Sequence, residues 1–189
     1  MNPHFTFNAL NSIQSLIASD KNDEAAIYLA EFSELMRNAL EASSIDTHPL
    51  HNELEIVKQY LELEKLRFKK MITFEINIGE SVHTNSTFIP PMIIRPLVEN
   101  AILHGLLPKK QAGEIRINVQ MTNEQELEIT VEDNGVGKRQ SSNKNKPASK
   151  GLKLIDERLK LNNKTNSIIV TSPVKDKAGF RATIKIYLK

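Results

Sequence analysis

The sequence predicts an α+β protein in which a helical region precedes a domain of mixed helices and strands. Residues 1 to about 70 contain no glycine and have only Pro3 and Pro49 as helix breakers, whereas all seven glycines follow Met71. After Met71, strands in pairs alternate with helices, a pattern typical of helices on one face of a largely antiparallel, mixed sheet. We therefore expect a helical region over residues 1–70 and a second domain over residues 71–189.

The helical region is predicted to contain three helices. Asn2 is a favourable N-cap with Pro3 at the first helical position, so a helix begins here and runs to about Ser19. A second periodic run follows the polar turn SDKND, and the two runs predict an antiparallel helical hairpin. Pro49 begins a third helix, residues 49–70. Its apolar positions recur near helical spacing at Leu54, Val57, Leu61, Leu63 and Phe68.

The second domain is predicted from alternating segments bounded by glycine and polar turns. The expected strands are 72–78, 114–121, 127–132, 167–171 and 178–188, the expected helices are 91–104 and 152–161, and residues 137–150 form a polar loop.

His4 is predicted to lie on a polar stripe of the first helix. At about 100° per residue, Asn8, Asn11 and Ser15 fall within about 40° of His4. The apolar residues fall on the opposite side, which we expect to form the core of the hairpin: Ala9, Leu10, Ile13, Leu16 and Ile17. No second histidine or carboxylate lies at i+3 or i+4, which argues against a metal site. His4 is then either an exposed nucleophilic imidazole or an ordinary surface residue.

The stretch RPLVENAILHG holds the first candidate ligand-binding residues. On a helix, Asn100 and His104 lie four residues apart and share a face, and Glu99 lies about 100° away at the edge of the same cleft. We expect Gly105 to end this helix. An asparagine oxygen facing a cleft suits Mg²⁺, which prefers oxygen ligands and is usually shared with phosphates. The alternative is an ordinary surface pair on an amphipathic helix.

The stretch ITVEDNGVG holds a second set of candidate ligand-binding residues. An acidic residue at a strand end, Asp133, can accept a hydrogen bond from an exocyclic amine, and Gly135 and Gly137 let backbone approach a ligand. Asn-Gly is also a common hairpin turn. Here, however, the chain continues into a loop with five basic and no acidic residues, KRQSSNKNKPASK, which suits a phosphate cover. Gly151 then opens a helix and can offer backbone N–H groups to an anion.

Composition excludes several function classes. The absence of cysteine excludes disulfides, thiolate metal sites and cysteine nucleophiles. A net charge of +2 argues against non-specific nucleic-acid binding. No run approaches the roughly 18 apolar residues of a membrane span, and no signal peptide is present. We expect a cytosolic protein or the cytosolic portion of a larger one.

Taken in order, five stretches resemble the catalytic core of a sensor histidine kinase, and more narrowly the LytS-type group. They cover nearly the whole chain: NPHFTFNALNSI, LHNELEIVKQYLELEKLRF, IPPMIIRPLVENAILHG, EDNGVG and KGLKLIDERL. The resemblance implies that residues 1–70 are the dimerisation and phosphoacceptor region. Residues 71–189 are implied to be a Bergerat-type ATP-binding domain of the GHKL family shared with gyrase, the Hsp90 chaperone and MutL.

The resemblance also implies roles for single residues in phosphoryl transfer. His4 would be the phosphoacceptor, Asn8 a candidate to orient it, and Glu99 a candidate base from the ATP side. Asn100 would bind Mg²⁺ together with the ATP phosphates, beside His104.

For the nucleotide itself, Asp133 would bind the adenine amino group, with Gly135 and Gly137 shaping that pocket. The lid over the phosphates would close at three residues that open the following helix: Lys150, Gly151 and Leu152.

The chain departs from the family at three places. Phe5 stands where many histidine kinases carry an acidic residue directly after the phosphoacceptor. The glycine-rich close of the lid is reduced to Ser149-Lys150-Gly151, and Leu103 stands where a lysine is common.

The function predicted from these features is that of an ATP- and Mg²⁺-dependent protein-histidine kinase of a two-component system. The phosphoryl group on His4 would pass to an aspartate of a response regulator, and the chain would form a homodimer through its N-terminal helices, without a nucleic-acid partner. We expect the cytoplasmic portion of a membrane sensor that meets the membrane only through segments before Met1. The alternatives are a non-catalytic dimeric signalling module that binds nucleotide weakly, and an ATPase machine of the gyrase kind.

Overall fold

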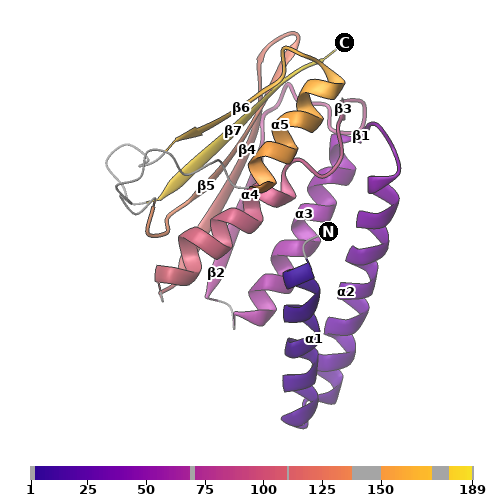
Figure 1. Ribbon diagram of the computed structural model, residues 1–189, viewed down its shortest axis with the longest axis vertical. Helices are drawn as coiled ribbons and strands as arrows, with labels where there is room; N and C mark the ends of the chain where they lie inside the picture. The colour runs from indigo at the N-terminus through magenta and orange to yellow at the C-terminus, as the bar shows by residue number, and fades with distance from the viewer. Residues whose placement is uncertain (1–2, 69–70, 110, 138–149, 172–178, 189) are drawn as a thin grey trace.

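The helical region forms a rod that projects beyond the rest of the molecule (Figure 1). The computed structural model describes residues 3–68, 71–109, 111–137, 150–171 and 179–188. Helix α1 (Pro3–Ala18) packs against α2 (Asn22–Ser43), which confirms the predicted hairpin. Helix α3 (Leu50–Arg67) contacts α2 on one side and the sheet and α4 on the other, so it joins the rod to the α/β part.

The main sheet has five strands in the order β2-β4-β5-β7-β6. Strand β2 (Ile72–Ile78) is parallel to β4 (Gly113–Asn123), and all the other pairs are antiparallel. The remaining strands are β5 (Glu126–Asp133), β6 (Ser167–Thr171) and β7 (Phe180–Tyr187). The predicted mixed, largely antiparallel sheet is therefore confirmed.

Helices cover one face of this sheet (Figure 1). They are α4 (Arg95–Asn100), a π-helix η1 (Ala101–Leu106), a 3₁₀ turn η2 (Leu107–Lys109) and α5 (Lys150–Asn162). Alternate residues of the central strands point to this face and are buried, as on β4 with Ile115, Ile117 and Val119. Residues between them carry charge on the opposite face, as in the Arg116–Glu114 pair. This one-sided arrangement confirms the predicted α+β fold class.

A second, two-stranded sheet was not predicted. Strand β1 (His48–Pro49) pairs antiparallel with β3 (Phe88–Ile89) just before α3 begins. Two residues per strand are too few for any alternation to show in the sequence.

The helix expected over residues 91–104 has different bounds. It begins at Arg95, because Met92 has a left-handed φ of 61° that no α-helix accommodates. Gly105 does not end it: the chain continues as the π-helix through Leu106. The prediction that Gly105 is the terminal residue was therefore wrong.

The hairpin core is narrower than predicted. Ala9 and Ile13 are buried, but Leu10 and Ile17 are 49% and 54% exposed. Two packed helices cover only a narrow stripe of each other, so the flanks of the predicted apolar face remain on the surface.

Candidate functional site

Asp133 lies buried at the end of β5, where the chain turns away from the sheet. Its Oδ1 accepts a hydrogen bond from the Gly135 N–H at 2.8 Å. Burial raises the pKa of this carboxyl to about 6, against the opposing effects of the Gly135 hydrogen bond and the Lys109 charge. A buried acceptor at a strand end is the arrangement that the sequence predicts for binding an exocyclic amine.

Glycines allow the π-helix to lie directly against Asp133. A Cβ on Gly105 would stand 2.4 Å from Asp133 Oδ1, and a Cβ on Gly135 would stand 2.2 Å from the Gly105 carbonyl. Neither distance occurs between real atoms, so both positions require glycine. The Val136 N–H donates to the Gly105 carbonyl at 3.0 Å and ties the two segments together. Gly137 follows with a φ of 69°, again in the left-handed region.

Asn100 is the last residue of α4 and lies immediately before the π-helix. Asn100 and Glu99 are half-buried, whereas His104 is exposed. The i→i+5 hydrogen bonds of a π-helix change the spacing on which the shared face of Asn100 and His104 was predicted. Single π-helical turns are frequent at functional sites, and this one connects Asn100 to the Asp133 contact at Gly105.

Glu53 fixes the start of α4, a role that was not predicted from the sequence. Its side chain is fully buried, and its Oε2 accepts from the Met92 N–H at 2.8 Å. Its Oε1 accepts from the N–H groups of Ile93 and Ile94, both at 2.9 Å, and His48 Nε2 lies 3.0 Å from Oε2. The carboxylate thus satisfies backbone donors that a helix start leaves unpaired. The sequence did contain a signal for the burial of Glu53, since this residue falls three residues after Leu50, on the apolar stripe of α3.

The lid side of the site is only partly described. Residues 138–149, the predicted phosphate cover, lie outside the described residues, as does the side chain of Lys150. Leu152 is half-buried and packs against the core, and a Cβ on Gly151 would meet nothing within 4 Å. Arg158 of α5 donates to the Pro91 carbonyl at 2.6 Å, which links this helix to the segment before α4.

The start of α1 lies beside α4. His4 is in the first turn of α1, and its side chain and the predicted cap Asn2 lie outside the described residues. The orientation of His4 therefore stays a prediction. Phe5 is buried, and Asn8 and Glu99 line one small cavity. The structure thus brings together two of the predicted catalytic residues, Asn8 and Glu99.

Glu64 lines the same cavity and was also missed. Its Oε2 lies 2.6 Å from Arg67 Nη2, and its side chain is 2% exposed. Burial raises the pKa of this carboxyl to about 7, while the Arg67 charge and the Tyr60 hydroxyl oppose the shift. A buried carboxyl with a raised pKa therefore lies beside the histidine helix.

Neither a metal cluster nor a membrane span is found in the described part of the chain. Its side chains form no group of three or more histidine, cysteine, aspartate or glutamate residues that suits a metal ion. The half-buried Asn100 still fits Mg²⁺, because this ion commonly takes one or two protein oxygens and completes its shell with phosphates and water. None of the described helices is both long and apolar enough to cross a bilayer.

Comparison with known proteins shows which proteins this chain resembles. Residues 1–72 match the family described as histidine kinase. The sensor protein LytS of Oceanobacillus iheyensis is 37% identical over 137 residues, which are 72% of this chain and 23% of LytS. The sensor histidine kinase/phosphatase LytS of Staphylococcus aureus (strain MRSA252) is 34% identical with the same coverage. The predicted resemblance to LytS-type sensor histidine kinases is confirmed.

A longer match spans both halves of the chain. The uncharacterized protein YwpD of Bacillus subtilis is 35% identical over 164 residues, or 84% of this chain. The chain spans 58% of the length of YwpD and about a quarter of each LytS protein.

Solved structures show the same fold. The histidine kinase domain of the Erythrobacter litoralis EL346 blue-light activated kinase has a TM-score of 0.56 at 16% identity, covering 96% of this chain and 95% of that one. Histidine kinase ThkA, in complex with response regulator protein TrrA, has a TM-score of 0.54 at 14% identity and covers 99% of this chain and 60% of its own. The fold predicted from the sequence is that of histidine kinase catalytic domains.

Proposed function

We propose that this chain is an ATP-dependent protein-histidine kinase that phosphorylates His4 and passes the phosphoryl group to an aspartate of a response regulator. The observation that carries the proposal is the shared cavity of Asn8 and Glu99, which places the histidine helix against the helix of Asn100. The match of residues 1–72 to the histidine kinase family supports kinase activity. The complex of ThkA with a response regulator supports the choice of partner.

The nucleotide would be held by the residues around the π-helix. Asp133 would accept a hydrogen bond from the adenine amino group, in a pocket shaped by Gly135 and Gly137. Asn100 would hold Mg²⁺, which offsets the phosphate charge during transfer. The phosphate side would be closed by four further residues: His104, Lys150, Gly151 and Leu152.

The chain's own chemistry begins at the His4 imidazole. A ring nitrogen would form a bond to the γ-phosphorus as the bond between that phosphorus and the ADP oxygen breaks. Asn8 would orient the ring from one helical turn further along α1. Glu99 would accept the ring proton released in this step, the role that an acid after the histidine fills elsewhere and that Phe5 cannot fill.

The helical rod would form a homodimer through its exposed apolar side chains. On α1 these include Phe7, which is 66% exposed, with Leu10 and Ile17; on α2 they include Ile27 and Leu40, both 60% exposed. A row of large apolar residues on two packed helices marks a surface that a second copy can cover. We further propose that residues 1–70 are the dimerisation and phosphoacceptor region and residues 71–189 the ATP-binding domain, in the cytoplasmic portion of a membrane sensor.

Labelling with γ-labelled ATP and Mg²⁺ tests the proposal. The protein is expected to gain label that is lost in acid and kept in base, and His4→Gln and Asn100→Ala are expected to abolish it. His83→Gln, at an exposed histidine outside the site, is the control and should label normally. ATP binding without labelling would contradict the kinase and indicate the non-catalytic signalling module. ATP hydrolysis without labelling would indicate an ATPase machine.

A further inference from the structure

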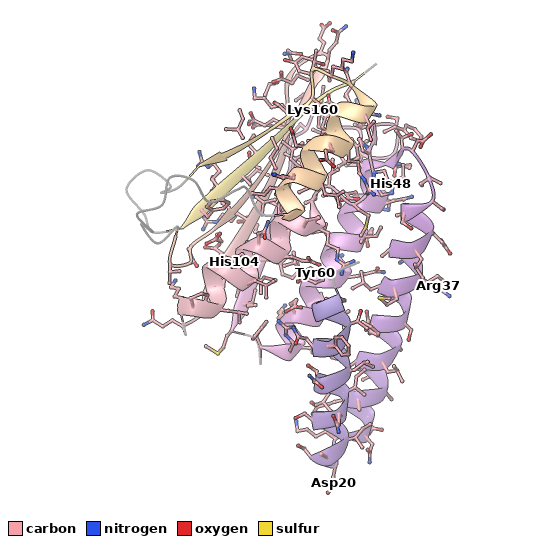
Figure 2. The ribbon with its side chains drawn as sticks, viewed as in Figure 1. Asp20, Arg37, His48, Tyr60, His104 and Lys160 are labelled. Carbon is pink, nitrogen blue, oxygen red and sulfur yellow. The ribbon has the colours of Figure 1, made fainter. Side chains whose placement is uncertain are left out.

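A buried arginine lies where the first turn of α1 meets the first turn of α4. The Arg95 guanidinium carbon is 4.9 Å from the ring centre of Phe5 and 5.1 Å from that of Tyr60, and Arg95 is only 2% exposed. The two rings lie 5.1 Å apart at 55° to each other. We call Phe5, Arg95 and Tyr60 the arginine clamp. In Figure 2, Tyr60 is seen on α3 beside the start of α1.

The clamp holds the arginine by ring faces and by charge. Arg95 Nη2 lies 3.3 Å from Glu99 Oε1, which balances its charge. Within the described residues, neither Nε nor Nη2 of Arg95 has a hydrogen-bond partner. Such a contact joins two elements without the directional bonds that fix Glu53 at the same helix start. The clamp is therefore suited to docking one moving part on another.

The position of the clamp in the sequence relates it to the proposed reaction. Phe5 directly follows His4, and Glu99 directly precedes Asn100, so each proposed functional residue is one Cα step of about 3.8 Å from a residue at this contact. Phe5 and Asn8 of α1 line the same cavity as Glu99 and Leu103. The contact lies within one chain.

We propose that the arginine clamp docks the His4 helix onto the phosphate end of the nucleotide site of the same chain, so that phosphoryl transfer runs in cis. Arg95 and Phe5 are positioning residues for this step. The inference rests on the proposed kinase function. It also assigns a role to Phe5: the ring that replaces the usual acid holds the histidine helix in place.

Mixed dimers test the cis geometry. His4→Gln and Asn100→Ala chains, co-expressed with different tags and purified through both, each lack one half of the reaction. Transfer in cis predicts less than about a tenth of wild-type label in the mixed preparation, because no single chain carries both residues. Label approaching half of the wild-type level would overturn the proposal.

Kinetics test the positioning role. Arg95→Lys keeps the charge but loses the planar group that stacks on the rings, and Phe5→Leu keeps an apolar side chain but loses the ring face. Each is expected to lower kcat for autophosphorylation about tenfold with KM for ATP unchanged, since only the approach of His4 is affected. The controls Arg116→Lys and Phe88→Leu make the same changes at exposed positions outside the site and should leave both constants unchanged. An unchanged or higher kcat, or a loss confined to KM, would overturn the proposal.

Cross-linking tests the docking without nucleotide. The chain has no cysteine, so Asn8→Cys with Leu103→Cys gives a unique thiol pair across the cavity. A short bis-thiol cross-linker is expected to give an intrachain product that runs at monomer mass. A product at dimer mass, or none, would contradict docking in cis. If wild-type protein takes no label from ATP, the kinase function fails, and this cross-link alone decides whether the docking is correct.

Discussion

The two ends of the helix that carries Asn100 are held in opposite ways. At its start, Glu53 accepts three backbone N–H groups and lies beside His48, so a buried carboxyl group with a full set of partners fixes the backbone. At its end, Gly105 and Gly135 remove side chains so that backbone and the Asp133 carboxyl can touch. The start should therefore be sensitive to lost hydrogen bonds, and the end to added volume.

The largest effect is expected at the start. Glu53→Ala leaves three buried backbone N–H groups without an acceptor, and we expect the free energy of unfolding to fall by about 3–5 kcal/mol. Urea denaturation measures this. Glu55→Ala, an exposed glutamate two residues away, should change it by less than about 0.5 kcal/mol. Equal losses in the two variants would show that Glu53 does not fix the helix.

At the Gly105 end of the helix, the effect of added volume can be separated from that of helix propensity. The same substitution by alanine is made at Gly135, which contacts Gly105, and at Gly151 in α5. Gly135→Ala forces a Cβ against the Gly105 carbonyl, and we expect a loss of about 1–3 kcal/mol together with loss of ATP binding. Gly151→Ala has open space inside α5 and should gain about 0.5–1 kcal/mol, because alanine favours helix. Thermal unfolding and a nucleotide titration compare them. A Gly135→Ala protein that binds ATP normally would refute the close contact.

The buried carboxyl of Glu64, which lines the cavity with Glu99 and Leu103, should make stability depend on pH. The pKa of Glu64 is raised from 4.5 to about 7, so the folded state keeps its proton longer than the unfolded state. Stability from this group is present in full below pH 4.5 and is lost as the pH rises to 7. In Glu64→Gln the fall in unfolding free energy over this range should be smaller than in the wild type by roughly 3 kcal/mol. An unchanged slope in denaturation between pH 4.5 and 7.5 would contradict the raised pKa.

The buried carboxyl of Asp133, at the contact with Gly105, should make nucleotide binding depend on pH. The pKa of Asp133 is raised to about 6, and only its ionised form offers both oxygens to the adenine amino group. Affinity for ADP should therefore fall below pH 6, and Asp133→Asn should weaken it about tenfold or more at pH 7.5 without unfolding the protein. Calorimetric titration at several pH values measures both effects. Affinity independent of pH between 5 and 8 would count against this role of Asp133.

The two ends of the helix that carries Asn100 also differ in how well the sequence predicts their contacts. Glycine spacing and the EDNGVG stretch locate Asp133 and its contact with Gly135, because only glycine allows such a close backbone contact. The strands over 72–78 and 167–171 likewise have the predicted bounds. Glu53 and Arg95 were missed as structural residues because charged side chains are usually exposed, and their burial depends on partners far away in the chain. The π-helix and the short β1–β3 pair arise from tertiary packing and leave no periodic pattern.

The hairpin gives an intermediate case. Periodicity identifies α1 and α2 and correctly places Ala9 and Ile13 inside. It does not show that Leu10 and Ile17 remain exposed, because one apolar face can pack against its own chain or against a second copy.

The most direct test of the account is to map the phosphate. The chain has five histidines, and peptides from protein incubated with ATP and Mg²⁺ can be sequenced by mass spectrometry at neutral to basic pH, where phosphohistidine survives. We expect a single phosphate on His4, absent from the Asn100→Ala protein. A phosphate on any other residue, or none in a protein that binds ATP, would contradict it.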